Sequence, residues 1–209
     1  MRPMKLTLTG VQKRFNRRTI FQKIEIEIRG PGSLAVVGRN GSGKSTLAKI
    51  VAGVLSPTSG SVQLELDGAV IPRVERYRHL GFVSSYLTLY DEFTAAENVS
   101  LLEAMRSGIT PQPSAVDALL AAMGLEARRN DRVGTFSSGM KQRVKYAVAL
   151  VHRPPLLILD EPTANLDFDG ISLVKRVTAR QKSEGLLLVA TNDPQEANWC
   201  DDRIELGKE

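Results

Sequence analysis

The sequence predicts one α/β domain over residues 1–209, with buried strands between helices and a helical segment inserted. Three observations predict it. A glycine-rich loop at residues 38–46 stands between an apolar stretch and a helix-like stretch. A second apolar run, residues 156–159, ends in two acidic residues. Between them, over residues 95–129, apolar residues recur at helical spacing. A chain of 209 residues is long enough to bury one sizeable core.

Two alternating stretches, residues 5–11 and 23–28, predict a strand pair that turns near Asn16. The other predicted strands are 33–37, 61–66, 80–84, 156–159, 186–190 and 203–206. The predicted helices are 46–53, two within 95–129 broken by Pro111 and Pro113, 139–151, 170–183 and 194–200. We therefore expect an α/β core from residues 1–84 and 137–209, and a helical subdomain at about 85–136.

The glycine-rich loop is the most specific pattern in the chain. It reads G-R-N-G-S-G-K-S-T and fits G-x-x-x-x-G-K-[ST], in which backbone N–H groups cradle a phosphate chain. Lys44 would reach the β- and γ-phosphates, and the Ser45 hydroxyl would hold Mg²⁺. The alternative is a glycine-rich turn without a ligand, but the required strand and helix both flank it. The predicted nucleotide contacts are Gly38, Arg39, Asn40, Gly41, Ser42, Gly43, Lys44, Ser45 and Thr46.

Two carboxylates follow the apolar run 156–159, where ligands of open α/β sheets bind. Asp160 is predicted to bind Mg²⁺, and Glu161 to polarise the water that attacks a γ-phosphate. Acidic residues at strand ends often only cap the next turn. Together with the phosphate loop, the pair favours hydrolysis of a nucleoside triphosphate.

Charge and composition narrow the class of protein. The net charge is +5 and the pI about 9.5, which favours anionic partners. The basic residues form no long tract, so nucleic acid is not a predicted partner. Cys200 is the single cysteine, which excludes an internal disulfide. With no membrane-spanning run and no signal peptide in the sequence, we expect a soluble, intracellular chain.

A third segment, residues 136–143, would by itself be a polar turn that opens a helix. The order of the motifs, however, resembles that of the ATP-binding-cassette (ABC) ATPases, the nucleotide-binding subunits of ABC transporters. The resemblance covers essentially the whole chain. It implies a P-loop NTPase core with a mixed sheet and flanking helices, an antiparallel β subdomain and an inserted helical subdomain. It also implies ATP and Mg²⁺ as ligands.

The resemblance assigns further nucleotide contacts. Ser137, Ser138, Gly139 and Met140 match the signature segment, which in the family caps the γ-phosphate bound by a second copy. Asp167 matches the loop that crosses the dimer interface. Phe15 matches the aromatic residue that stacks on adenine, although it would equally suit an ordinary strand. The implied partner is a second copy of this chain, with two ATP molecules between the copies.

Two positions depart from the family pattern. Ser85 stands where the family has a glutamine that touches Mg²⁺ and the attacking water, and Asn192 where it has a γ-phosphate-contacting histidine. Asparagine can donate a hydrogen bond but cannot carry positive charge. We therefore expect slow ATP hydrolysis by Glu161, Lys44 and Asn192, with Ser45, Asp160 and Ser85 around the metal.

The resemblance also implies a separate transmembrane permease, whose coupling helix would dock near the aromatic residues of 86–93. The chain would then sit on the cytoplasmic face of the inner membrane. Its compactness resembles the cytochrome c biogenesis ATPases of the haem exporter. Two alternatives stay open: a non-transport ABC protein, and an ATP-gated binding module with little hydrolysis.

Overall fold

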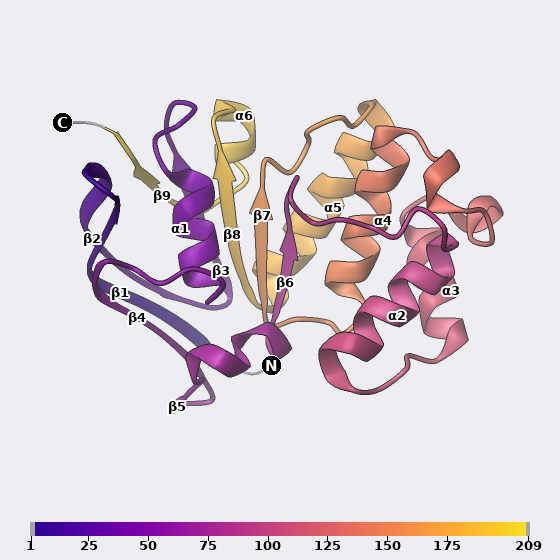
Figure 1. Cartoon of the computed structure of the whole chain (residues 1–209), viewed down its shortest axis with the longest axis horizontal. Coiled ribbons are helices and arrows are strands. Elements are labelled where there is room, and N and C mark those ends of the chain that lie inside the picture. Colours follow the sequence, from indigo (N-terminus) through magenta and orange to yellow (C-terminus); the bar gives the residue numbers. More distant parts are fainter. Residues whose placement is uncertain (1–2, 208–209) are drawn as a thin grey trace.

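The computed structural model describes residues 3–207 and contains two sheets flanked by helices (Figure 1). The antiparallel sheet has the order β2 (Arg18–Arg29), β1 (Met4–Phe15), β4 (Ser59–Leu66) and β5 (Ala69–Val70). The parallel sheet has the order β6 (Leu80–Val83), β7 (Leu156–Asp160), β8 (Leu186–Thr191), β3 (Gly32–Val37) and β9 (Asp202–Glu205). The antiparallel sheet lies to one side of the parallel one, and α2 and α3 to the other (Figure 1).

The α-helices are α1 (Lys44–Val51), α2 (Ala95–Ser107), α3 (Pro113–Ala122), α4 (Ser138–Leu150), α5 (Phe168–Glu184) and α6 (Pro194–Ala197). Short 3₁₀ helices span Arg73–Arg78, Glu126–Arg128 and Val133–Thr135. Across residues 3–207, no helix has both the length and the apolar character that crossing a bilayer requires.

The central parallel strands β7 and β8 are almost wholly apolar because both faces of the sheet are covered there, whereas the edge strand β9 is mostly polar and exposed. Along β7, Leu156 and Ile158 join the core that packs against α1 and the antiparallel sheet. Leu157 and Leu159 join a second core, under α4 and α5. Alternate side chains of this strand therefore pack into two different cores. A shift by one residue would exchange them, so the packing fixes the register of β7 in the sheet.

The predicted fold class is confirmed, with differences in detail. The antiparallel pairs form their own sheet, so the parallel sheet is not itself mixed. Both strands of the first pair are 12 residues long, because bulges let the ladder continue past the ends of simple alternation. Pro113 opens α3 instead of only ending a helix, since a first-turn residue needs no intrahelical N–H bond.

The inserted helical segment packs on α4. Val99 of α2 and Val116 and Leu120 of α3 share a buried cluster with Val144 of α4. Thr94 and Glu97 form a capping box that fixes where α2 begins. Because α4 belongs to both this cluster and the core, the subdomain boundary at about 136 stays a prediction.

A buried polar cluster ties α2 to the α/β core. Arg106 donates to both oxygens of Glu103, at 2.8 and 2.5 Å. His152 Nε2 lies 3.2 Å from the Leu80 carbonyl, which can only accept, so this nitrogen carries the proton. Burial lowers the pKa of His152 to about 4, and the charge of Arg106 adds to that effect. His152 is therefore neutral in the folded protein at neutral pH.

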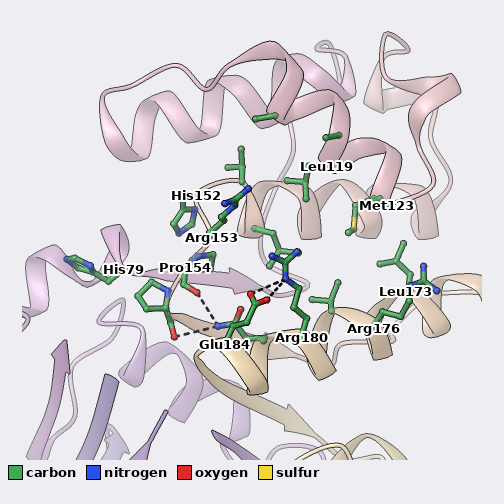
Figure 2. Close-up of a pocket in the computed structure, with 18 of the residues that line it drawn as sticks. His79, Leu119, Met123, His152, Arg153, Pro154, Leu173, Arg176, Arg180 and Glu184 are labelled. Carbon is green, nitrogen blue, oxygen red and sulfur yellow. Dashed lines mark hydrogen bonds and ion pairs between the residues drawn. The ribbon is translucent and has the colours of Figure 1, made fainter. Parts of the chain in front are cut away.

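His152 also lines a cleft with a volume of about 770 Å³ (Figure 2). Leu119 of α3 and Met123, which directly follows that helix, form one wall, and Arg176 and Arg180 of α5 another (Figure 2). The residues just before β7 line this cleft, whereas Asp160 lies at the opposite end of that strand. This cleft is thus separate from the predicted nucleotide site.

We expect His152 to make stability depend on pH. The unfolded chain, with an ordinary histidine pKa of about 6.5, takes up a proton before the folded chain does as the pH falls. Stability present above pH 6.5 is lost as the pH approaches 4. Protonation of this group alone lowers the free energy of unfolding by about 2 kcal/mol between pH 7 and pH 5.

The measurement is urea unfolding of the wild type and of His152→Gln at both pH values. The variant should lose about 2 kcal/mol less than the wild type over this interval. Equal losses in the two proteins would contradict the assignment, whatever their absolute stabilities.

Candidate active site

The predicted catalytic segments meet at one edge of the parallel sheet, where the carboxyl ends of the strands lie (Figure 1). The phosphate loop follows β3, the segment beginning with Ser85 follows β6, Glu161 follows β7 and Asn192 follows β8. Val37 pairs with Thr191, and Asp160 pairs with Ala190. This register brings the three central strand ends to the same level.

Two glycines of the phosphate loop are sterically required. Gly43 has φ +101°, and an added Cβ would lie 2.5 Å from Ile20 Cγ2. Gly38 would place a Cβ 2.5 Å from the Leu206 carbonyl oxygen. Gly41 also has positive φ, at +80°, but no atom lies within 4 Å of the added Cβ. The loop is packed at its two ends and open in its middle.

The interior of the loop suits an anion. Lys44 is only 5% exposed, and its Nζ donates to the carbonyls of Gly38 and Arg39 at 2.9 and 3.1 Å. The Ser42 hydroxyl is buried without a partner in the structure. The first N–H groups of α1 have no acceptor within their own helix, and the helix dipole favours negative charge there. These donors fit a phosphate chain.

Ser45 and Asp160 form the predicted metal pair. Ser45 Oγ donates to Asp160 Oδ1 at 2.8 Å. Burial raises the pKa of Asp160, and the bond from Ser45 offsets part of that rise. Within residues 3–207, no cluster of three His, Cys, Asp or Glu side chains could hold a metal alone. Ser45 and Asp160 would supply two oxygen ligands to Mg²⁺ and phosphate oxygens would supply others, in the oxygen-rich shell that this ion prefers.

Glu161 has a left-handed backbone, with φ +55°, which is unusual for a residue that is not glycine. Its N–H donates to the Ala190 carbonyl at 2.9 Å. The Tyr146 hydroxyl donates to the next carbonyl, that of Pro162, at 2.8 Å. Burial raises the pKa of Tyr146, so this hydroxyl stays a donor. The surrounding structure holds a strained turn in place and leaves the Glu161 side chain exposed.

Asn192 lies against the phosphate loop. Its Nδ2 donates to Asn40 Oδ1 at 2.8 Å, across 152 residues of sequence. Ser85 lies at the end of β6, and its carbonyl accepts from Lys145 Nζ at 3.4 Å. Asn192 thus reaches the loop directly, whereas the contact of Ser85 shown here is made by its backbone.

The signature segment and the Asp167 loop adjoin each other. Ser137 caps α4 by accepting from the Met140 N–H, and Gly139 leaves room for the Asn165 carbonyl oxygen, 3.0 Å from an added Cβ. Arg143 of α4 donates to Asp167 Oδ1 at 2.6 Å. The hydrogen bond from the Gly170 N–H lowers the pKa of Asp167 most, and the hydrogen bond from Arg143 lowers it further. Figure 1 draws α4 apart from α1, with β8 and β7 between them.

Phe15, the predicted adenine-stacking residue, lies at the end of β1 and is 46% exposed. Lys13 Nζ stands 4.7 Å from the centre of its ring. An aromatic ring that serves only the core would be covered, so its exposure leaves a face available for stacking.

Two residues that support the site, Lys49 and Glu196, are not predicted from the sequence. Lys49 Nζ lies 3.5 Å from the Tyr86 ring centre, beside the end of β6. Lys49 follows Ser45 by four residues on α1, and this helical spacing was a usable indication. Glu196, which bonds to residues near Glu161 and Asn192, gave no indication in the sequence because its partners come from two different strands.

Comparison with known families decides the assignment. The family model described as ABC transporter matches residues 21–164. The chain belongs to this family. The match includes the phosphate loop, the signature segment and the acidic pair, and the fold class agrees with it.

Relatives cover nearly all of this chain. The lipoprotein-releasing system ATP-binding protein LolD of Psychrobacter arcticus is 34% identical, over 96% of this chain and 95% of LolD. The aliphatic sulfonates import ATP-binding protein SsuB 1 of Burkholderia lata is 38% identical, but this chain spans only 60% of its length.

Solved structures agree. The ATP-binding cassette MJ0796, in a dimeric post-hydrolysis state bound to ADP and Pi, is 25% identical with a TM-score of 0.84. The match covers 96% of this chain and 94% of that one.

We predict different effects of alanine at two glycines of the loop. Gly43→Ala should lower the free energy of unfolding by about 2–4 kcal/mol, because it adds a clash to a left-handed backbone. Gly41→Ala should cost only about 1 kcal/mol in stability, since its Cβ meets nothing.

Urea titration measures both stabilities, and fluorescent ATP-analogue binding measures the consequence for the site. Gly41→Ala should still bind nucleotide at least about tenfold more weakly, because a side chain strains its left-handed backbone, at φ +80°, and shifts the neighbouring loop amides. Wild-type affinity in Gly41→Ala would contradict the placement of phosphate at this loop.

Proposed function

We propose that this protein binds and hydrolyses ATP as the nucleotide-binding subunit of an ABC transporter. The observation that supports it most is the convergence of three segments at one sheet edge. The anion-suited loop, the Ser45–Asp160 pair, Glu161 and Asn192 all lie there. Family membership supports the same function.

In the proposed mechanism, Lys44 exchanges its bonds to loop carbonyls for bonds to the β- and γ-phosphates. Ser45 and Asp160 would hold Mg²⁺, which neutralises charge on the phosphate oxygens when bound. Glu161 accepts a proton from water positioned opposite the leaving oxygen. Asn192 donates a hydrogen bond to a γ-phosphate oxygen.

We further propose that hydrolysis is slow. Asn192 cannot supply a charge-assisted contact, and Ser85 is too short to replace a glutamine at the metal. Losing such a contact to a developing charge reduces the rate by roughly ten- to a thousandfold. The same two substitutions favour the second candidate function, an ATP-gated binding module that dimerises with little hydrolysis.

A second copy of this chain is the proposed partner at the nucleotide. The signature segment and Asp167 adjoin each other and lie apart from the phosphate loop of their own chain (Figure 1). A head-to-tail dimer would bring them to the γ-phosphate of the other copy. The dimeric form of the similar cassette MJ0796 supports this arrangement.

A separate membrane permease is the other proposed partner. Tyr86, Tyr90 and Phe93 are exposed after β6, and the rings of Tyr90 and Phe93 lie 5.6 Å apart. Phe93 also lines a cleft of about 350 Å³ with residues of α2. Aromatic anchors beside a groove suit a short helix of a partner. The protein would then be peripheral on the cytoplasmic face of the membrane.

The transported substrate is set by such a permease. LolD and SsuB are named for lipoprotein release and sulfonate import. The more specific assignment to haem export for cytochrome c maturation therefore stays a prediction from the sequence.

We expect Glu161→Gln to abolish phosphate release while ATP binding changes by less than about threefold. The amide keeps the size of the side chain but cannot accept the proton. Phosphate-release and nucleotide-binding assays on purified protein check this. Equal phosphate release by the wild type and the variant would refute hydrolysis at this site and leave the binding module.

Asn192→His should raise kcat by at least about tenfold, because an imidazolium restores charge at the γ-phosphate. Asn192→Ala is the control and should hydrolyse ATP no faster than the wild type. An unchanged rate in Asn192→His would show that this position does not limit the reaction.

A further inference from the structure

Glu196 is a charged residue of α6 that the structure buries. Its side chain is 4% exposed. It accepts three hydrogen bonds, from the Thr163 N–H at 3.1 Å, from the Thr163 hydroxyl and from the Thr191 hydroxyl. Three donors on one carboxylate offset the cost of removing its charge from water.

The two threonines belong to the two strand ends that carry the proposed catalytic groups. Thr163 follows Glu161 by two residues, and Thr191 directly precedes Asn192. Thr163 donates to one carboxylate oxygen of Glu196, and Thr191 to the other. A single buried side chain therefore bridges the ends of β7 and β8 beyond the last ladder pair, Asp160 with Ala190.

We propose that Glu196 is a positioning residue that fixes the distance between Glu161 and Asn192 and makes the two segments move as one unit. Its carboxylate is buried and acts through Thr163 and Thr191. The inference rests on the proposed function, because it assigns Glu161 and Asn192 to the same γ-phosphate.

A role in capping α6 does not account for Glu196. Asp193 already caps that helix, accepting from the Gln195 N–H at 2.7 Å. The Asp193 N–H in turn donates to the Thr191 hydroxyl at 2.9 Å. The turn and the helix start have their own bonds, so the bonds of Glu196 to Thr163 serve the contact with the β7 end.

The first test is kinetic. Glu196→Ala should lower kcat for ATP by about 10- to 100-fold with KM changed less than about threefold, since misplacement by about 1 Å costs about 100-fold. Glu184→Ala removes an exposed glutamate paired with Arg180 and should leave both constants unchanged. Asn192→Ala should lower kcat in the wild type and have little further effect in Glu196→Ala. Equal, independent losses in the two backgrounds would overturn the inference.

The second test does not need hydrolysis. In Thr191→Val, amide exchange followed by NMR should accelerate at least about tenfold at Glu161, Thr163 and Ala164, on the other strand end. Exchange within α1 should stay as in the wild type. The reciprocal variant Thr163→Val should accelerate exchange at Asn192 and Asp193.

Acceleration confined to the mutated segment would overturn the inference, even if Glu196→Ala is inactive or fails to fold. A wild type that releases no more phosphate than Glu161→Gln would instead overturn the proposed hydrolysis. In that case the exchange data would still decide whether Glu196 couples the two segments.

Discussion

The site depends on the parallel backbone pairing of β3, β8 and β7. Their ladders run in register from Gly32 with Leu186 to Asp160 with Ala190. Because both faces of the strands are buried, a shift by one residue would move every side chain from one core to the other. The positions of the phosphate loop, the acidic pair and Asn192 follow from that register. Catalytic geometry is thus set by the cores and not by the loops themselves.

The groups that would touch ATP and the groups that hold them differ in burial. Glu161 and Asn192 are exposed, whereas Tyr146, Thr191 and Glu196 are buried. Each exposed group adjoins a residue bonded within that buried set: Pro162, next to Glu161, accepts from Tyr146, and Thr191, next to Asn192, donates to Glu196. Rigid support beneath an open edge allows a charged substrate to enter while its partners stay aligned.

Local patterns in the sequence predicted most of the fold and the segments that meet at the carboxyl edge of the parallel sheet. Glycines at 38 and 43, the apolar runs and the acidic pair are each encoded within a few neighbouring residues. The missed features depend on contacts across the chain. The bonds of Glu196 join α6 to the ends of two strands, and Lys145 reaches the Ser84 and Ser85 carbonyls from α4. A repeating pattern of apolar residues cannot indicate such contacts, because the two residues in most of these contacts are far apart in the sequence.

The two departures from the family pattern affect the site unequally. Asn192 keeps a hydrogen bond to the phosphate loop, through Asn40, so the strand end that carries it remains joined to the loop. After β6, Ser85 stands where the family has a glutamine. Lys145 donates to the Ser85 carbonyl, and Lys49 contacts the ring of the next residue, Tyr86. The phosphate cradle, with Lys44, Ser45 and Asp160, contains neither substitution. Under the proposed function, the cradle would keep its binding energy, while the charge that favours the transition state over the bound substrate would be reduced.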